Sequence, residues 1–269
     1  GGLAFEDVSL LGAGGVPLLD HVSFDVPRGE ILAVAGVQGN GQTELAEVIL
    51  GLRSPDSGVI RLEDADITRA KPRQSLDAGV GFIPEDRSTD GIIASFSIAD
   101  NLVLDQFRSS AFASFGSLKR GAIARNARDK EAEYDIRLTS IEDPVSSLSG
   151  GNQQKVVVAR EMSRDLTLLV ANQPTRGVDV GSIEFIHRRI VDVRDQGCAV
   201  LLISSELDEV ISLADRIAVM YRGRIVGIVP ADTGRDVLGL MMAGVPLDEA
   251  VAASSDSAHD DGAHRKEEQ

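Results

Sequence analysis

Cysteine is nearly absent from this chain of 269 residues, in which Cys198 is the only one. One thiol cannot build a disulfide framework within the chain, and it cannot supply a four-thiolate metal site. We therefore expect a protein of a reducing compartment. Because Cys198 precedes an apolar run, we expect it to be a small core residue and not a nucleophile.

Long apolar runs and an excess of positive charge are also missing. No apolar stretch approaches the roughly 18 to 20 residues that a membrane-spanning helix needs, so we expect a soluble chain. Lysine and arginine total 27 against 42 acidic residues, which gives a formal net charge of −15. A protein that binds a phosphate backbone needs a basic face, so this charge argues against a nucleic-acid partner.

Aliphatic residues are plentiful enough for a buried core, because hydrophobic residues make up 43% of the chain. The tail, residues 251–269, differs: it is acidic and nearly free of large aliphatic side chains, so we expect it to be disordered. We expect the preceding residues, 1–250, to form one domain. The chain begins with Gly1-Gly2, without Met or a leader, and we expect a piece of a longer polypeptide.

The first part of the chain predicts an antiparallel hairpin followed by a strand, a turn and a helix. Apolar and polar residues alternate in two runs between Leu3 and Val26, separated by glycines. The continuous apolar run Ile31–Ala35 is typical of a strand buried on both faces. Apolar residues then recur at helical spacing in Thr43–Leu52.

Further strands alternate with helices, which predicts an α/β fold with a mainly parallel sheet. Between Ala94 and Ser147 the alternation stops, and charged, helix-favouring stretches replace it. We interpret this region, at about residues 95–160, as an inserted helical subdomain. The other strand candidates are Val80–Ile83, Leu166–Ala171, Ala199–Ile203 and Arg216–Tyr221.

The turn after the predicted strand Ile31–Ala35 has the glycine spacing of a phosphate-binding loop. In such a loop, backbone N–H groups and a helix N-terminus surround phosphate oxygens. The position that should hold Lys is Gln42, so the phosphate-facing charge is missing. Taken alone, the loop is equally consistent with a plain glycine-rich turn. The candidate nucleotide-binding residues are Gly36, Gly39, Asn40, Gly41, Gln42 and Thr43, with Thr43 also a weak candidate for Mg²⁺.

A second motif, Leu148-Ser149-Gly150-Gly151-Asn152-Gln153-Gln154-Lys155, opens a helix with Ser149 as a possible N-cap. It resembles the signature sequence of ATP-binding cassette (ABC) proteins, and the form ending in Asn-Gln-Gln-Lys resembles that of sugar and nucleoside importers. The alternative interpretation is a capped helix start without a ligand. The order of loop, Pro84–Arg87, signature, Gln173–Asp179 and Ser204–Glu206 matches the cassette plan from Leu3 to about Gly244.

The resemblance implies a two-lobed ATPase domain with a P-loop NTPase core, an antiparallel β edge and the helical insert. Such a domain works head to tail with a second cassette, here expected in the same polypeptide, on the cytoplasmic face of integral membrane permease subunits. A solute-binding protein would be an indirect partner, and ATP and Mg²⁺ would be the cofactors. The signature residues expected to meet the partner's ATP are Ser149, Gly150, Gly151, Asn152 and Gln153.

Three further positions depart from the family pattern, which places Asp and Glu after the strand at Leu168–Ala171 and His at the switch. This chain has Asn172, Gln173 and Ser205 there. Amides keep the shape of the carboxylates but lose the metal-binding charge and the proton acceptor, which is worth about 10²- to 10⁴-fold in rate. No aromatic residue lies between Phe5 and Phe24, where a cassette usually stacks adenine. We expect negligible hydrolysis and weak ATP and Mg²⁺ binding at this site.

Two loops carry the remaining expectations. Glu85, Asp86 and Arg87 occupy the loop that, in the family, reports the nucleotide state to the permease; the alternative is a solvated turn with an Asp–Arg pair. Asp179 matches the loop that crosses to the partner cassette, and the alternative is a helix N-cap.

The resemblance leads us to expect the second cassette of a tandem importer, with a degenerate site of its own and a complete signature for its partner. The motifs around Ser182–Arg188 and Ala218–Arg224 favour the nucleoside branch over the simple-sugar branch. Two alternatives stay open at this point. One is a non-transport cassette that acts as a nucleotide-responsive interaction module, and the other is an active transport ATPase that tolerates Gln42 and Asn172.

Overall fold

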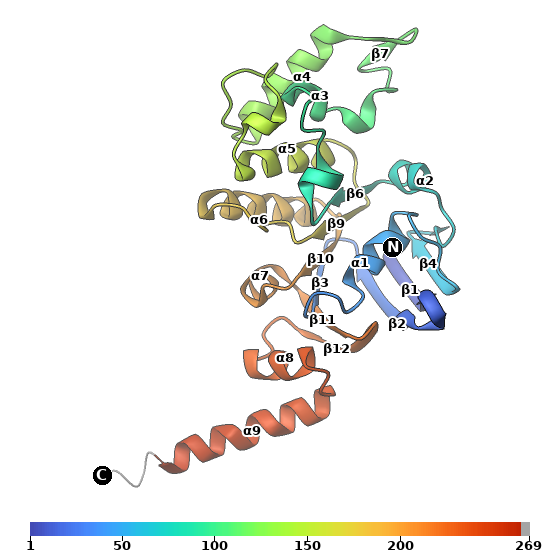
Figure 1. The fold of residues 1–269 in the computed structure, drawn as a ribbon. Helices are drawn as coiled ribbons and strands as arrows, with labels where there is room; N and C mark the ends of the chain where they lie inside the picture. Colours follow the sequence, from blue (N-terminus) through green and yellow to red (C-terminus); the bar gives the residue numbers. More distant parts are fainter. Residues whose placement is uncertain (265–269) are drawn as a thin grey trace.

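The computed structural model describes the backbone of residues 1–264 and the side chains of residues 1–255. Its central sheet has six strands in the order β12-β11-β3-β10-β9-β6 (Figure 1), all parallel except the edge strand β12. The prediction of a mainly parallel sheet is therefore confirmed. The strands are β3 (Ile31–Ala35), β6 (Val80–Ile83), β9 (Leu168–Asn172), β10 (Ala199–Ser204), β11 (Arg216–Tyr221) and β12 (Arg224–Pro230).

A second, antiparallel sheet contains the predicted hairpin, β1 (Gly2–Leu11) and β2 (Pro17–Pro27), whose tip holds the short 3₁₀ turn Ala13–Gly15. Two strands that the sequence analysis did not anticipate, β4 (Ser57–Leu62) and β5 (Ala65–Asp66), extend it on the β1 side. Phe5 and Phe24 stack across the hairpin with ring centroids 4.6 Å apart, which helps to fix its register.

The strand alternation places two hydrophobic cores on opposite faces of the central sheet. Leu32 and Val34 of β3 pack with the antiparallel sheet and α1 (Gln42–Ile49), whereas Ala33 packs on the other face. That other face is covered by helices α5, α6, α7 and α8 (Figure 1). The fold is thus three-layered, and the buried strands of the central sheet are apolar except where β9 and β10 end, at Asn172 and Ser204. Helix bounds outside the insert are α2 (Pro72–Asp77), α6 (Val180–Asp195), α7 (Leu207–Leu213) and α8 (Arg235–Met242).

Between β6 and β9 the chain forms the insert that the sequence predicted as helical. It also contains a two-stranded hairpin, β7 (Ala113–Ser114) and β8 (Ser117–Leu118), which the helix-favouring composition around it did not indicate. A π-helical turn at Arg87–Gly91 leads into the insert. The other elements are α3 (Ile98–Asn101), α4 (Arg120–Glu133), α5 (Gly150–Met162) and the 3₁₀ turns Leu104–Gln106 and Val145–Ser147.

Most of the tail is helical in the structure, whereas the sequence predicted disorder. Residues 251–264, predicted to be disordered, continue α9 (Leu247–His264), which extends away from the body (Figure 1). The acidic composition misled here because alanine, the strongest helix former, recurs at Ala250, Ala252 and Ala253. Residues 265–269 lie outside the described residues. Within the part of the chain that the structure describes, no helix is both long and apolar enough to cross a bilayer.

Candidate phosphate loop and signature helix

The glycine-rich loop connects the carboxyl end of β3 to α1. Gly39 and Gly41 have φ of +92° and +110°, a backbone conformation that residues with a side chain rarely adopt. At Gly36 an added Cβ would lie only 2.7 Å from the backbone carbonyl oxygen of Met220, so the loop requires glycine there for space. The loop therefore has the tight path of a phosphate-binding loop, with exposed Thr43 in the first turn of α1.

Gln42 folds back onto this loop. Its Oε1 accepts a hydrogen bond from the backbone N–H of Asn40 at 2.9 Å, and its Nε2 donates to the carbonyl of Val37 at 3.0 Å. The side chain is only 8% exposed. Backbone N–H groups of this kind are the donors that a phosphate would use. One of them is therefore already satisfied by the chain's own side chain.

The strand that should carry the metal and base carboxylates ends in two amides. Asn172 closes β9 and is buried, and Gln173 follows with φ of +49°. Gln173 Oε1 accepts hydrogen bonds from the backbone N–H and the hydroxyl of Ser205, at 3.3 and 3.4 Å. The structure therefore brings Gln173 and Ser205 together, at positions where the family has a base and a histidine, but leaves them no titratable group.

A pocket of about 500 Å³ joins Thr43, Asn172, Glu85 and Asp86. Two of these residues, Thr43 and Asn172, stand where the resemblance leads us to expect contacts to Mg²⁺. Thr43 offers a hydroxyl and Asn172 an amide, while Glu85 is paired with an arginine. Mg²⁺ is usually held by carboxylates together with substrate phosphates, and among the described residues no cluster of three metal-ligating side chains occurs. The residues present fit Mg²⁺ poorly.

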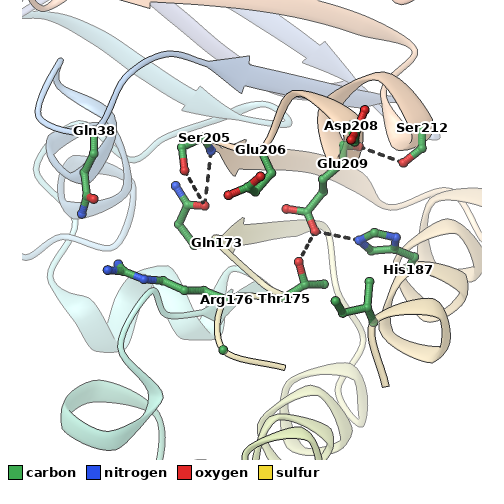
Figure 2. A pocket seen from close by; sticks show the side chains of 12 residues that line it. Gln38, Gln173, Thr175, Arg176, His187, Ser205, Glu206, Asp208, Glu209 and Ser212 are labelled. Atoms are coloured by element: carbon green, nitrogen blue, oxygen red, sulfur yellow. Dashed lines mark hydrogen bonds and ion pairs between the residues drawn. The ribbon is translucent and has the colours of Figure 1, made fainter. Parts of the chain in front are cut away.

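A neighbouring pocket of about 720 Å³ contains a hydrogen-bonded cluster that the sequence analysis did not single out (Figure 2). Glu209 Oε2 accepts from Thr175 Oγ1 at 2.5 Å and contacts His187 Nε2 at 2.7 Å. Burial alone would raise the pKa of Glu209, but hydrogen bonds from His187, Thr175 and Ser204 outweigh it and lower that pKa. Glu209 is therefore a buried, ionised carboxylate. Its contact with His187 links α7 to α6.

The signature helix α5 is capped as predicted. Ser149 Oγ accepts from the backbone N–H of Asn152 at 3.3 Å and from the Asn152 side chain at 3.0 Å. Gln153 Nε2 donates back to the carbonyl of Leu148. Close packing surrounds the two glycines: a Cβ at Gly151 would lie 2.3 Å from Asp179 Oδ1. A side chain at Gly151 would therefore force the side chains of Asp179 and Ser182 to move.

The signature and the phosphate loop face different pockets within this chain. Ser149 and Asn152 line a polar pocket of about 380 Å³ together with Asp179. No signature residue lines the two larger pockets, as far as the described residues go. The structure therefore does not bring the signature to the chain's own phosphate loop.

The remaining loop residues have definite partners. Asp86 caps the π-helical turn by accepting from the backbone of Ser88 and the hydroxyl of Thr89, and these bonds, led by that of the Thr89 side chain, lower its pKa. The charge of Arg87 also lowers the pKa of Asp86, but less than these hydrogen bonds do. Asp179 is the N-cap of α6, accepting from Ser182 N–H at 3.1 Å, which lowers its pKa.

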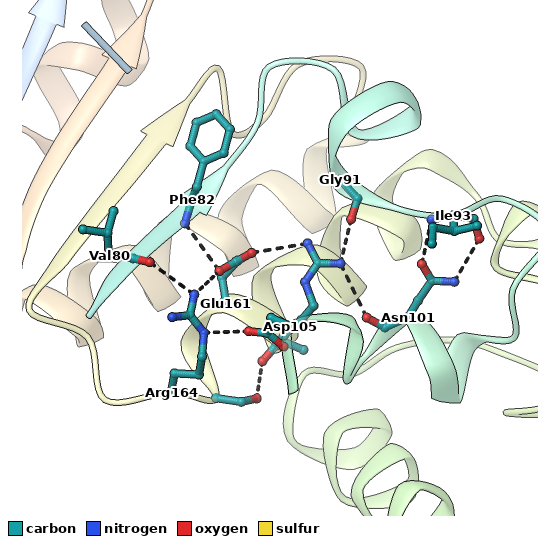
Figure 3. A network of polar contacts seen from close by, with 11 residues as sticks. Val80, Phe82, Gly91, Ile93, Asn101, Asp105, Glu161 and Arg164 are labelled. Atoms are coloured by element: carbon teal, nitrogen blue, oxygen red, sulfur yellow. Dashed lines mark hydrogen bonds and ion pairs between the residues drawn. The ribbon is translucent and has the colours of Figure 1, made fainter. Parts of the chain in front are cut away.

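A buried polar network links α5 to β6, the strand that precedes the Glu85–Arg87 loop (Figure 3). Glu161 Oε2 accepts from Arg164 at 2.5 Å and from the backbone N–H of Phe82 at 3.4 Å. Arg160 donates to the carbonyl of Gly91 at 2.7 Å. Burial and the neighbouring Glu161 raise the pKa of Asp105, although Arg164 lies 2.6 Å away. This network ties the insert to the central sheet.

Sequence reasoning missed two sets of contacts at the site. One is the His187–Glu209–Thr175 cluster, and the other is an ion pair between Glu85 and Arg176. The sequence did offer a signal for the Glu85–Arg176 pair. Glu85 is an acid where the family usually has Gln, and the Pro174–Gly177 motif contains a cation. The first carried no signal, since its members come from three separate elements.

Comparison with known proteins agrees with this geometry. A family model described as "ABC transporter" matches residues 19–176, which span the phosphate loop, the signature and β9. The chain is 44% identical over 248 residues to the nucleoside import ATP-binding protein NupA of Lactococcus lactis, covering 92% of this chain and 49% of NupA. It is 42% identical over 253 residues to the guanosine import ATP-binding protein NupO of Bacillus subtilis, covering 94% and 50%.

The chain therefore spans about half the length of these relatives. Among solved structures, a dimeric ATP-binding cassette, MJ0796, bound to ADP and phosphate matches with a TM-score of 0.73 at 17% identity, covering 86% of this chain and all of the other. That likeness shows the fold. With the family model covering more than half of the chain, these findings establish that the chain belongs to the ABC transporter family, as one of its ATP-binding domains.

Proposed function

We propose that this chain is the second, C-terminal cassette of a tandem ATP-binding protein in a nucleoside importer. NupA and NupO are named for nucleoside and guanosine import, and each is about twice as long as the stretch matched here. A second cassette in the same polypeptide would account for that length. Integral membrane permease subunits would then be the direct partners, at the cytoplasmic face of the membrane, and a solute-binding protein an indirect one.

The observation that carries the proposal is the contrast between the two halves of the site. The phosphate loop is occupied by Gln42, and its catalytic positions hold Asn172, Gln173 and Ser205. The signature helix is complete, capped by Ser149 and turned away from the chain's own loop. A domain built in this way would hydrolyse ATP poorly at its own phosphate loop. Its signature helix would still contribute to the ATP site of a partner cassette.

The signature would contribute through its helix start. The N-terminal N–H groups of α5, at Gly150 and Gly151, carry partial positive charge, and a phosphate held against them would be stabilised. ATP, when bound by the partner cassette, supplies the phosphoryl group. Ser149 would orient toward it, and the absence of a side chain at Gly151 leaves the backbone amides open to the phosphate. Such preorganised donors cost no rearrangement when charge develops.

The transported solute is proposed from the relatives' names alone, since an ATP-binding domain of this kind does not touch it. Nucleosides are the first choice and simple sugars the second. The test is uptake by the complete transporter, reconstituted in vesicles with internal ATP or ADP. Labelled guanosine should accumulate only with ATP, and excess ribose should not compete. Uptake of ribose but not guanosine would contradict the solute class, and absence of any association with a permease would contradict the transport role.

A further inference from the structure

Glu85 receives two hydrogen bonds on a single carboxylate oxygen. Gln38 Nε2 donates to Glu85 Oε1 at 2.6 Å, and Arg176 Nη1 donates to the same atom at 2.5 Å. Gln38 belongs to the phosphate loop, while Arg176 follows the amide-bearing end of β9. Glu85 therefore joins the phosphate loop to the loop that leads into α6.

Arg87 continues this path to the signature helix. Its Nη1 donates to the backbone carbonyl of Arg176 at 3.1 Å. Its Nη2 lies only 2.6 Å from where a Cβ of Gly150 would stand, and the carbonyl of Gly177 lies 3.0 Å from the same point. The guanidinium thus packs directly against the first residue of α5. Contacts run without a gap from the phosphate loop through Glu85, Arg176 and Arg87 to the signature.

The Glu85–Arg176 pair contributes little to folding. The Arg176 side chain is 58% exposed and the Glu85 side chain 22%, and exposed ion pairs are typically worth between zero and about 1 kcal/mol. Its geometry is more informative than its energy. With both partners charged, the Arg176–Glu85 contact holds its groups more tightly than a bond from Arg176 to an uncharged Gln amide at this position would. The pair can therefore fix the path of the loops without carrying the fold.

We propose that Glu85 and Arg176 are a positioning pair, which holds Arg87 against Gly150 and so sets the signature helix for the partner cassette's nucleotide. The proposal rests on the proposed function, because it assigns the signature to the partner. Neither residue touches the reacting atoms. In this arrangement, whatever moves Gln38 and the phosphate loop also moves the signature, even though the loop is a poor nucleotide site.

The test uses the complete transporter, with ATP turnover measured across ATP concentrations. The variants are Glu85→Gln, Arg176→Gln and the charge swap Glu85→Arg with Arg176→Glu. Each single variant should lower kcat by roughly tenfold with KM for ATP within about twofold, since misplaced catalytic groups reduce the rate of the bound state. The swap should restore at least half of kcat, because the amide of Gln38 can accept from Arg as well as donate to Glu.

The matched control is the exposed pair Glu6–Arg61 on the antiparallel sheet, 3.3 Å apart, whose single variants and swap should leave kcat unchanged. The melting temperature of every variant should stay close to that of the unmodified transporter. A fall in kcat that follows a fall in melting temperature would overturn the proposal. So would single-variant losses that the swap does not repair, because each residue would then act through a contact of its own.

One further variant separates this proposal from the function on which it rests. If Gly150→Asp abolishes turnover while the Glu85 and Arg176 variants keep full kcat, the signature serves the partner and the positioning pair is wrong. If Gly150→Asp is itself fully active, the proposed function fails.

Discussion

Gln42 Oε1 accepts the backbone N–H of Asn40 at 2.9 Å, so a side chain of the phosphate loop occupies a donor of that same loop. The substitution of Lys by Gln therefore has two effects. It removes a cation that would face phosphate, and it provides an acceptor that competes with phosphate. We expect both effects to weaken nucleotide binding at this loop.

Replacing Gln42 with Lys should strengthen ATP binding by the isolated domain. Lys has no acceptor, so it frees the Asn40 N–H, and it restores a charge-assisted contact worth about 1.5 to 3 kcal/mol. We expect an affinity gain of roughly tenfold to a hundredfold by calorimetry, with no hydrolysis. Gln42→Met, which removes the acceptor without adding charge, should give a smaller gain. An unchanged affinity in both variants would mean that phosphate does not enter this loop.

The unmodified domain should release no phosphate from ATP in the presence of Mg²⁺. Asn172 and Gln173 offer neither a metal-binding charge nor a base, and Ser205 is engaged with Gln173. The measurement is a coupled phosphate assay over hours at high protein concentration. Steady turnover that Thr43→Ala abolishes would show that the site is catalytic after all.

Glu209 should stabilise the domain in a pH-dependent manner. Its pKa is lowered in the folded state below the ordinary 4.5, so the unfolded chain binds more protons as pH falls and stability decreases. Glu209→Gln should lower the free energy of unfolding by about 1 to 3 kcal/mol at pH 7. The difference in the free energy of unfolding between the unmodified domain and Glu209→Gln should narrow as pH falls below 4.5.

Denaturant titrations at pH 7 and pH 4 measure this difference. Glu184→Gln, which changes an exposed carboxylate of α6 whose ion-pair distance to Arg188 is 3.9 Å, is the matched control and should have no effect at either pH. A Glu209→Gln penalty that is equal at both pH values would contradict an ionised, hydrogen-bonded carboxylate.

Cys198 should resist alkylation in the native domain. It is 4% exposed, and burial raises the pKa of its thiol to about 12, so almost no thiolate exists at pH 8. Iodoacetamide should label it only after unfolding in guanidinium chloride, as read by mass spectrometry. Labelling of native protein at the rate of the unfolded chain would place the thiol at the surface.

Much of the fold follows from local patterns that the sequence displays. Strands buried on both faces, such as Ile31–Ala35 and Val80–Ile83, are short apolar runs, and their bounds agree with β3 and β6. The hairpin β7–β8 was missed because its strands are two residues each and no apolar alternation marks them. The helix at residues 251–264 was not expected because this segment is acidic, although it also contains alanine, the strongest helix former.

The site was predictable where function depends on residue type at fixed spacing, as in the loop around Gln42 and the cap at Ser149. It was not predictable where function depends on which side chains meet. The acceptor of Gln42 reaches Asn40 only because the loop turns back on itself. Glu85 and Arg176, far apart in the sequence, meet only through the packing of β6 beside β9.

An impaired phosphate loop beside a working signature should make two variants of the same chain behave differently. In the complete transporter, Gly150→Asp places a carboxylate at the helix start where phosphate charge is stabilised, and its bulk also meets Arg87 and the Gly177 carbonyl. Gln173→Ala alters a site that has already lost its base. Gly121→Asp, the same change in the first turn of α4, controls for an acid at an exposed helix start, and Gly150→Ala for bulk alone.

The most direct measurement is ATP turnover of these four variants in the reconstituted transporter. The account predicts that Gly150→Asp abolishes turnover, that Gly150→Ala reduces it less, and that Gln173→Ala and Gly121→Asp retain most of it. Equal loss in Gly150→Asp and Gln173→Ala, or normal turnover in Gly150→Asp, would contradict the division of labour between this chain's phosphate loop and its signature.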